Sequence, residues 1–407
     1  MEIMLATKPP TGSNPEPPPG SVLFDDVTHG EKFVAAKSAA GGLYLAGDQW
    51  VDLTGDATKF IKVREDVLQM WGSTSSVCLL IRTFTNKFYF IGTSPFHDTS
   101  ALGPLYTTWQ DVTSIFSIIA TGEFKKVIVT TRNVGVLLTN GELYITGQNT
   151  TGVYGNGTTT TNLTTFTKAN LANVKDFIIY QAASIANCVV FASIINSPFT
   201  YAWGTSSNQS IINTGYVQDP YNLYMYAGTG FNLGTASRPT SLFMPDYTNF
   251  LCDWDTQNAT TWRGSFDNGI IGNNVSGGTN GNNYMRGQPA NLVIRNRTLA
   301  PTNATQSFHF GWTNSADDNL YGIGYNSNGQ LGTGTKTTTL ITSFTIVVGF
   351  KKSEMKKFSN PFVNTQRSYL LTQKGALYTT GKNEFNCMPG ISGDTVKFTL
   401  LTHPMNP

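Results

Sequence analysis

The histidines and cysteines of this sequence could in principle carry acid–base, nucleophilic or metal chemistry, but none has the spacing that this chemistry needs. The eight residues are His29, His97, His309, His403, Cys78, Cys188, Cys252 and Cys387. They form no HExxH or CxxC motif, and no histidine is placed as a base for a cysteine nucleophile. We therefore interpret the histidines as structural or surface residues. The cysteines are best explained as free buried thiols.

Two acidic pairs and the Gly-rich loops also fail as sites. Asp253 and Asp255 begin a segment like a calcium loop, but its glutamate position, twelfth from Asp253, is Gly264. Asp317 and Asp318 fall between two strand-like segments, where a hairpin turn explains them better than catalysis does. No Gly-rich segment reads GxxxxGK[ST] before a helix, as a phosphate loop requires. The sequence therefore predicts no catalytic residue, no metal and no cofactor, and we expect no enzyme.

The composition limits the partners and the compartment. Charged residues make up 13% of the chain and the formal net charge is +2, which is too small to indicate a nucleic-acid-binding surface. No run of 18 apolar residues occurs, and the N-terminus has no secretory signal pattern, so we expect cytoplasmic synthesis without membrane insertion. The abundant Thr, Asn and Gly favour strands and tight turns.

A hairpin pattern recurs along the chain. Residues 135–161 read as a strand, the turn Asn140-Gly141, a second strand and a Gly-rich loop. Asn-Gly tolerates the positive φ angles of a type I′ turn, which makes it a strong hairpin signal. Residues 315–334 and 368–390 repeat the pattern, the latter with its turn at Lys374-Gly375. The chain is therefore built from repeats of a strand-rich unit.

One glycine closes the second strand of each repeat and serves as a register mark. The marks are Gly47, Gly92, Gly147, Gly204, Gly264, Gly324 and Gly381. They lie 45 to 60 residues apart, which suits one four-stranded blade per repeat. In three copies further glycines follow five and eight positions after the mark: Gly152, Gly155, Gly269, Gly272, Gly329 and Gly332. The sequence thus predicts an all-β, seven-bladed β-propeller.

On these residues the chain resembles the regulator-of-chromosome-condensation repeat family. The segment GIGYNSNGQLGTG, residues 322–334, follows the family pattern closely, and Asn149, Asn326 and Asn383 each stand two positions after a mark glycine. The resemblance extends over residues 25–401 and is weak in the first, second and fourth copies. It implies a propeller fold, in a family that includes exchange factors, chromatin binders and interaction modules.

The two ends of the chain have separate predicted roles. Residues 21–407 form the propeller, and we expect the C-terminal strand, 395–401, to close it by completing the first blade beside residues 33–46. Residues 1–20 are a Pro-rich extended tail or tether that cannot join a sheet, because proline lacks the backbone N–H. Its prolines are candidate anchor residues: Pro9, Pro10, Pro15, Pro17, Pro18 and Pro19.

A dense group of aromatic residues follows the fourth repeat. The candidate binding surface consists of Tyr216, Tyr221, Tyr224, Tyr226 and Phe231. Exposed aromatic rings are enriched at binding surfaces, although the same rings could instead cover the blade beneath them. The Gly/Asn-rich residues 269–287 are expected to form a protruding loop.

Composition and repeats together suggest how the protein is used. Few charges, a Pro-rich tether and Thr/Asn/Gly-rich strands resemble structural proteins of tailed bacteriophages. We therefore expect a non-enzymatic virion protein of the tail, collar or baseplate, present in multiple copies. Its tail would bind other virion proteins, and its propeller would be displayed to bind a protein or a host-surface glycan. The alternative is a cellular scaffold or exchange-factor-like regulator that uses a propeller face.

Overall fold

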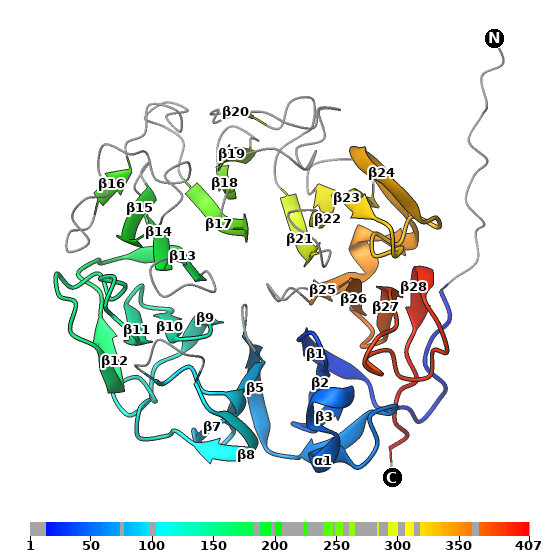
Figure 1. Cartoon of the computed structure of the whole chain (residues 1–407), viewed down its shortest axis with the longest axis horizontal. Helices are drawn as coiled ribbons and strands as arrows, with labels where there is room; N and C mark the ends of the chain where they lie inside the picture. The colour runs from blue at the N-terminus through cyan, green and yellow to red at the C-terminus, as the bar shows by residue number, and fades with distance from the viewer. Residues whose placement is uncertain are drawn as a thin grey trace.

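The computed structural model shows sheets arranged in a ring (Figure 1). It describes residues 14–73, 77–97, 103–181, 188–196, 200–205, 318–359 and 366–406, together with the strand segments 224–226, 239–246, 249–254, 260–264, 283–284, 292–299 and 306–312. These residues form seven four-stranded antiparallel sheets. The fold is therefore all-β, as the sequence predicted. In the described part no helix is long and apolar enough to cross a membrane.

Each sheet takes its four strands from one continuous stretch of chain. The first three sheets are β1 (Phe24–His29), β2 (Val34–Ser38), β3 (Leu43–Ala46), β4 (Ile61–Arg64); β5 (Val67–Gly72), β6 (Cys78–Thr83), β7 (Phe88–Thr93), β8 (Leu105–Asp111); and β9 (Phe124–Val129), β10 (Asn133–Leu138), β11 (Leu143–Gly147), β12 (Asn162–Lys168). The fourth and fifth are β13 (Val174–Gln181), β14 (Cys188–Ile194), β15 (Thr200–Thr205), β16 (Tyr224–Tyr226); and β17 (Pro239–Asp246), β18 (Asn249–Trp254), β19 (Thr260–Gly264), β20 (Asn283–Tyr284). The last two are β21 (Leu292–Leu299), β22 (Gln306–Trp312), β23 (Asn319–Asn326), β24 (Thr337–Lys351); and β25 (Met355–Phe358), β26 (Arg367–Thr372), β27 (Leu377–Gly381), β28 (Thr395–Leu400). Short helices η1 (Asp48–Trp50) and α1 (Val51–Thr54) join β3 to β4, and η2 (Lys352–Glu354) joins β24 to β25.

The first strand of every sheet carries a β-bulge at its second residue. The unpaired residues are Asp25, Leu68, Lys125, Lys175, Thr240, Val293 and Lys356. These strands lie nearest the centre of the ring (Figure 1). A bulge increases the local twist of a strand, so the same deformation recurs at the same place in each sheet. The seven sheets are therefore copies of one structural unit.

The mark glycines occupy equivalent positions, as expected from the repeat. The φ angles of Gly47, Gly92, Gly147, Gly204, Gly324 and Gly381 all lie between 98° and 110°. At Gly147, an added Cβ would lie under 3.0 Å from the carbonyl oxygen of Arg132, which accepts a 3.0 Å hydrogen bond from the Gln148 N–H. Only glycine combines this φ with so close an approach of another backbone.

The prediction that residues 395–401 complete the first blade is wrong. β28 pairs with β27, as the fourth strand of the seventh sheet. The first sheet already has its own fourth strand, β4, so it has no free position there. Without β28, the seventh sheet would have only three strands.

The ring is instead closed by residues beyond β28. The N–H of Val22 donates to the carbonyl of Pro404 at 2.7 Å, and the N–H of Asn406 donates to the carbonyl of Gly20 at 2.8 Å. His403 adds a side-chain link between Val22 and β27. Apolar residues of the first and seventh sheets also share one cluster, which includes Phe24, Tyr44, Phe60, Tyr369 and Met388. We call residues 20–22 with 402–406 the terminal clasp.

The described part of the tail is bound to the seventh sheet and to β24 of the sixth sheet. The carbonyl of Pro15 accepts a hydrogen bond from the Tyr378 hydroxyl, and Glu16 pairs with Lys374. The side-chain amide of Asn14 donates to the carbonyl of Gly349 at 2.6 Å. Burial and the nearby Glu16 raise the pKa of Tyr378 to about 12. Residues 14–20 are thus outside every strand and are seated on the propeller.

Candidate functional site

Three of the histidines make buried structural contacts. His29 Nδ1 lies 2.6 Å from Ser359 Oγ, and its ring packs against Tyr369. His309 Nε2 lies 3.0 Å from the carbonyl of Leu331. Burial lowers the pKa of His29 well below its usual value and that of His309 to about 4. Both rings are therefore neutral at physiological pH.

His403 has both ring nitrogens committed. Nδ1 lies 2.7 Å from the carbonyl of Val22, and Nε2 accepts the N–H of Leu377 at 3.0 Å. These contacts require a neutral ring that is protonated on Nδ1. Burial lowers the pKa of His403, in agreement with that state. The fourth histidine, His97, is also buried.

The cysteines whose side chains are described are buried thiols. Cys78, Cys188 and Cys387 are free, and burial raises the pKa of each, to about 12 for Cys188 and about 11 for Cys387. A thiol with a raised pKa is a poor nucleophile. Cys252 lies in β18, and its side chain is outside the described residues. No group of three His, Cys, Asp or Glu that could hold a metal occurs among the described residues.

The asparagine after the mark glycine organises the loop between the third and fourth strands. Asn149 donates through Nδ2 to the carbonyl of Thr158 at 2.9 Å and accepts the N–H of Tyr154 at 2.9 Å. Asn326 does the same with the carbonyl of Thr335 at 2.8 Å and the N–H of Leu331 at 3.0 Å. In both loops the asparagine side chain therefore bonds a carbonyl and an N–H that would otherwise have no partner within the loop.

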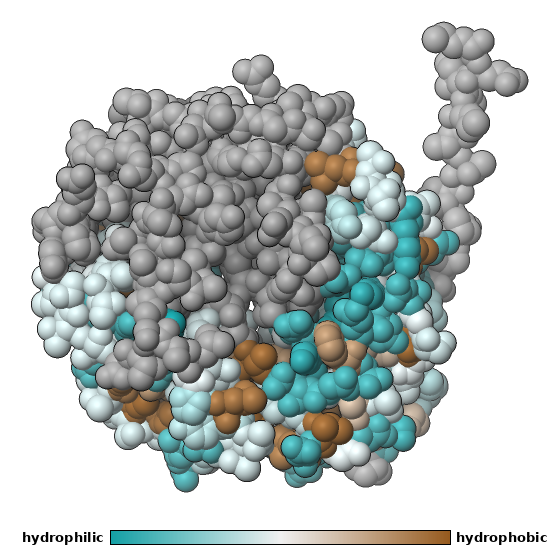
Figure 2. All heavy atoms as spheres, viewed as in Figure 1, coloured by the Kyte–Doolittle hydropathy of each residue, from teal (hydrophilic) through white to brown (hydrophobic). Residues whose placement is uncertain are grey.

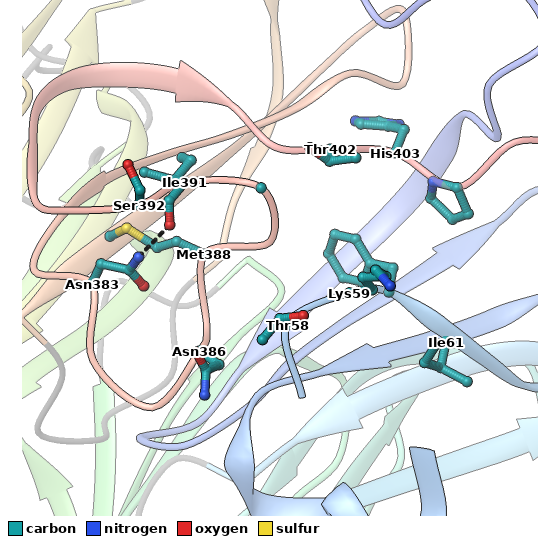
Figure 3. Close-up of a pocket in the computed structure, with 13 residues that line it drawn as sticks. Thr58, Lys59, Ile61, Asn383, Asn386, Met388, Ile391, Ser392, Thr402 and His403 are labelled. Atoms are coloured by element: carbon teal, nitrogen blue, oxygen red, sulfur yellow. Dashed lines mark hydrogen bonds between the residues drawn. The ribbon is translucent and has the colours of Figure 1, made fainter. Parts of the chain in front are cut away.

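A pocket of about 620 Å³ lies at the junction of the seventh and first sheets (Figure 3). One wall is the loop between β27 and β28, and the other is the segment that leads into β4, with the clasp beside them. The lining residues include Thr58, Phe60, Ile61, Asn383, Met388 and Ile391. Figure 2 shows hydrophilic residues gathered over the seventh sheet, beside scattered hydrophobic ones. A pocket at this junction is not predicted from the sequence, because residues 395–401 are expected there to complete the first blade.

One signal of the pocket was present in the sequence. The seventh repeat keeps Asn383, but the positions five and eight after Gly381 are Asn386 and Pro389 instead of glycine. Asn386 adopts a left-handed φ of 53°, as the equivalent glycines do, but Pro389 cannot take the positive φ of Gly155 and Gly332, so the loop must differ from there on.

The other predicted residues are placed as follows. The aromatic surface lies outside the described residues except for Tyr224 and Tyr226, of which only the backbone, in β16, is described. Pro9 and Pro10 are also outside, as are Asp255 and Asp317. Asp318 accepts the N–H of Ser353 at 2.9 Å, which is a structural contact beside η2.

Comparison with solved structures identifies the fold. No family model and no curated protein sequence matches the chain. The structure is similar to that of yeast RCC1 (Prp20) bound to Kap60, with a TM-score of 0.60 at 11% identity, over 98% of this chain and 90% of that chain. The structure of Prp20p from Saccharomyces cerevisiae gives a TM-score of 0.61 at 12% identity, over 93% and 87% of the two chains. The similarity shows an RCC1-like β-propeller fold.

Proposed function

We propose that this protein binds other molecules and catalyses no reaction, with each of its seven sheets forming one blade of a closed propeller. The main support is the structural use of the residues best suited to chemistry. His29, His309 and His403 are neutral and hydrogen-bonded inside the ring. The thiols of Cys188 and Cys387 are buried and have raised pKa values. A scaffold with these properties suits display and recognition.

We propose further that it is a virion protein of a tailed bacteriophage, in the tail, collar or baseplate. The support is compositional: 13% charged residues, 40 glycines and a Pro-rich start. Several copies would be present in each particle. The propeller would face outward and bind a protein or a host-surface glycan, without contacting nucleic acid or entering a membrane.

The tail would bind other virion proteins. Residues 14–20 contact the sixth and seventh sheets and the C-terminal residues, so we assign this contact to residues 1–13, which include Pro9 and Pro10. An extended Pro-rich segment loses little entropy when a partner orders it. The Tyr216 to Phe231 segment is the proposed outward surface.

The second candidate function is a cellular scaffold or exchange-factor-like regulator. It is favoured by the fold similarity to yeast RCC1 (Prp20), which is bound to Kap60 in one structure and for which binding to Gsp1p and histones is described with the other. The low charge of this chain disfavours the regulator function, because binding an acidic or basic partner requires a face of the opposite charge. Charges on the innermost strands are also paired, for example Lys126 of β9 with Asp176 of β13 at 2.7 Å.

Particle assembly tests the virion proposal. Deletion of residues 1–13 should abolish incorporation into particles and leave the melting temperature unchanged, since residues 14–20 and the clasp remain. As a control, replacement of Tyr221, Tyr224 and Tyr226 by serine should leave incorporation intact. Normal incorporation of the deletion variant would refute the anchor. A gene that lies apart from capsid and tail genes would refute the virion role, and binding to Gsp1p or histones at physiological salt would favour the regulator.

A further inference from the structure

In the sixth sheet, the loop after the mark glycine fills the gap that faces the next sheet. Leu331 is fully buried there, and its N–H donates to Asn326 Oδ1. The carbonyl of Gly329 accepts the hydroxyl of Thr380 in the seventh sheet at 2.8 Å. An added Cβ on Gly329 would lie under 3.0 Å from Thr395, where β28 begins. The loop therefore packs against the start of the neighbouring fourth strand.

The third sheet fills the corresponding gap in the same way. Tyr154 is buried, and its N–H donates to Asn149 Oδ1 at 2.9 Å. The carbonyl of Val153 accepts the indole N–H of Trp203, in the fourth sheet, at 2.7 Å. Both loops thus place a large apolar or aromatic side chain between two sheets, and the backbone N–H of that residue donates to the asparagine of the loop.

In the seventh sheet a pocket remains beside the corresponding loop, although Met388 is buried in one cluster with Phe24 and Phe60. Asn383 keeps its Nδ2 bond to the carbonyl of Ile391 at 2.6 Å, but its buried Oδ1 accepts no hydrogen bond from the described residues. Met388, five positions after Asn383 as Leu331 is after Asn326, is buried without donating its N–H to Asn383. The pocket of about 620 Å³ extends from this loop to Ile61, where β4 begins. It therefore separates the seventh loop from the start of β4, whereas the Gly334 N–H of the sixth loop donates directly to the Val396 carbonyl of β28 at 2.8 Å.

We infer that this pocket binds a short peptide segment of a partner protein, which packs against the start of β4 as the loop of the sixth sheet packs against the start of β28. The peptide places an apolar side chain against Phe60, Met388 and Ile391. Its chemistry is that of the Gly-Gln-Leu-Gly loop of the sixth sheet. The inference rests on the proposed binding function and names the class of ligand.

The lining favours a neutral ligand over a charged one. The cation at the rim, Lys59, is paired with Asp56 at 3.1 Å and is largely exposed. An exposed, paired charge contributes little to binding. The deeper wall is apolar, so a buried side chain of the peptide supplies the affinity.

A synthetic peptide of residues 327–335, which contains Leu331, provides the probe. Fluorescence anisotropy of the labelled peptide is titrated with the full chain. Thr58→Trp fills the pocket from one exposed wall residue. Thr158→Trp is its matched control, because both threonines close the same turn: Thr58 donates twice to Asp56 Oδ1 at 2.8 and 2.6 Å, and Thr158 donates twice to Asn156 Oδ1 at 3.1 and 2.9 Å.

We expect saturable binding with a Kd below about 1 mM. Thr58→Trp should weaken it about tenfold or more, as should a Leu331→Asp peptide, whereas Thr158→Trp should not change it. Ser392→Trp, from the opposite wall, gives a second blocking variant if Thr58→Trp melts early. Absence of saturation by about 1 mM, or equal binding by both blocking variants, would overturn the inference. Incorporation into particles without peptide binding would refute only the pocket, and the reverse result would refute only the virion role.

Discussion

A mark glycine has a positive φ and a close approach of another backbone at the place of its missing Cβ. Replacing it by alanine should cost more stability than replacing a glycine that lacks one or both of these features. Gly147 combines a φ of 104° with a close approach to the carbonyl of Arg132. The backbone conformation alone costs about 1–3 kcal/mol for a residue with a Cβ. A Cβ would also displace the Arg132 carbonyl and weaken the hydrogen bond that it accepts from the Gln148 N–H, which is worth about 1 kcal/mol. Gly147→Ala should therefore lower the free energy of unfolding by about 2–4 kcal/mol.

Two other glycines separate these causes. Gly55 has a φ of 71° but open space around its missing Cβ, so Gly55→Ala should cost about 1–2 kcal/mol from backbone conformation alone. Gly393 has open space and no positive φ, so Gly393→Ala should be neutral or stabilise by up to about 1 kcal/mol. Urea denaturation followed by circular dichroism, with reversibility verified, measures all three variants. A Gly147→Ala cost equal to that of Gly55→Ala would show that the close approach to Arg132 has no energetic weight.

Three further predictions concern the ring and its closure. The pKa of His309 falls from 6.5 in the unfolded chain to about 4 in the folded one, so the unfolded chain binds the proton first as the pH falls. The contribution of the neutral ring to the free energy of unfolding is therefore complete above pH 6.5 and is lost as the pH falls toward 4. This amounts to about 3 kcal/mol, measured by urea denaturation across that range, and His309→Gln should flatten the profile. Arg367→Met should destabilise by about 2–4 kcal/mol, because the buried guanidinium donates to the Glu31 carbonyl across the junction; an unchanged urea midpoint would contradict this. Removing residues 402–407, which include His403, should lower the melting temperature in calorimetry, because the clasp to Val22 is lost; equal melting of the two proteins would place closure elsewhere.

The repeat could be predicted from sequence because its determinants are local. Asn140-Gly141 fixes a turn, and Gly147 is required by contacts within its own hairpin. Closure could not be predicted, because the pairing of residues 20–22 with 402–406 depends on contacts between opposite ends of the chain. The strand at 395–401 was recognised, but β4 was not, since η1 and α1 interrupt the repeat before Ile61.

The candidate site was hidden for a related reason. The position of Asn383 follows from the repeat, and the loop that contains it differs in sequence from the loops after Gly147 and Gly324. That the difference opens a pocket follows only from the facing wall, Thr58 to Ile61, which is more than three hundred residues away in the chain.

The arrangement of four consecutive strands in every sheet also bears on how such a ring can be rearranged. No strand is shared between the first and last sheets, and the clasp brings Gly20 and Asn406 within one hydrogen bond. A short linker between these ends, with new termini in the connection from β4 to β5, would give a circular permutant in which every sheet stays intact. At the level of the gene, duplication or loss of a single contiguous segment adds or removes one complete sheet, so the size of the ring can evolve without any strand changing its partners.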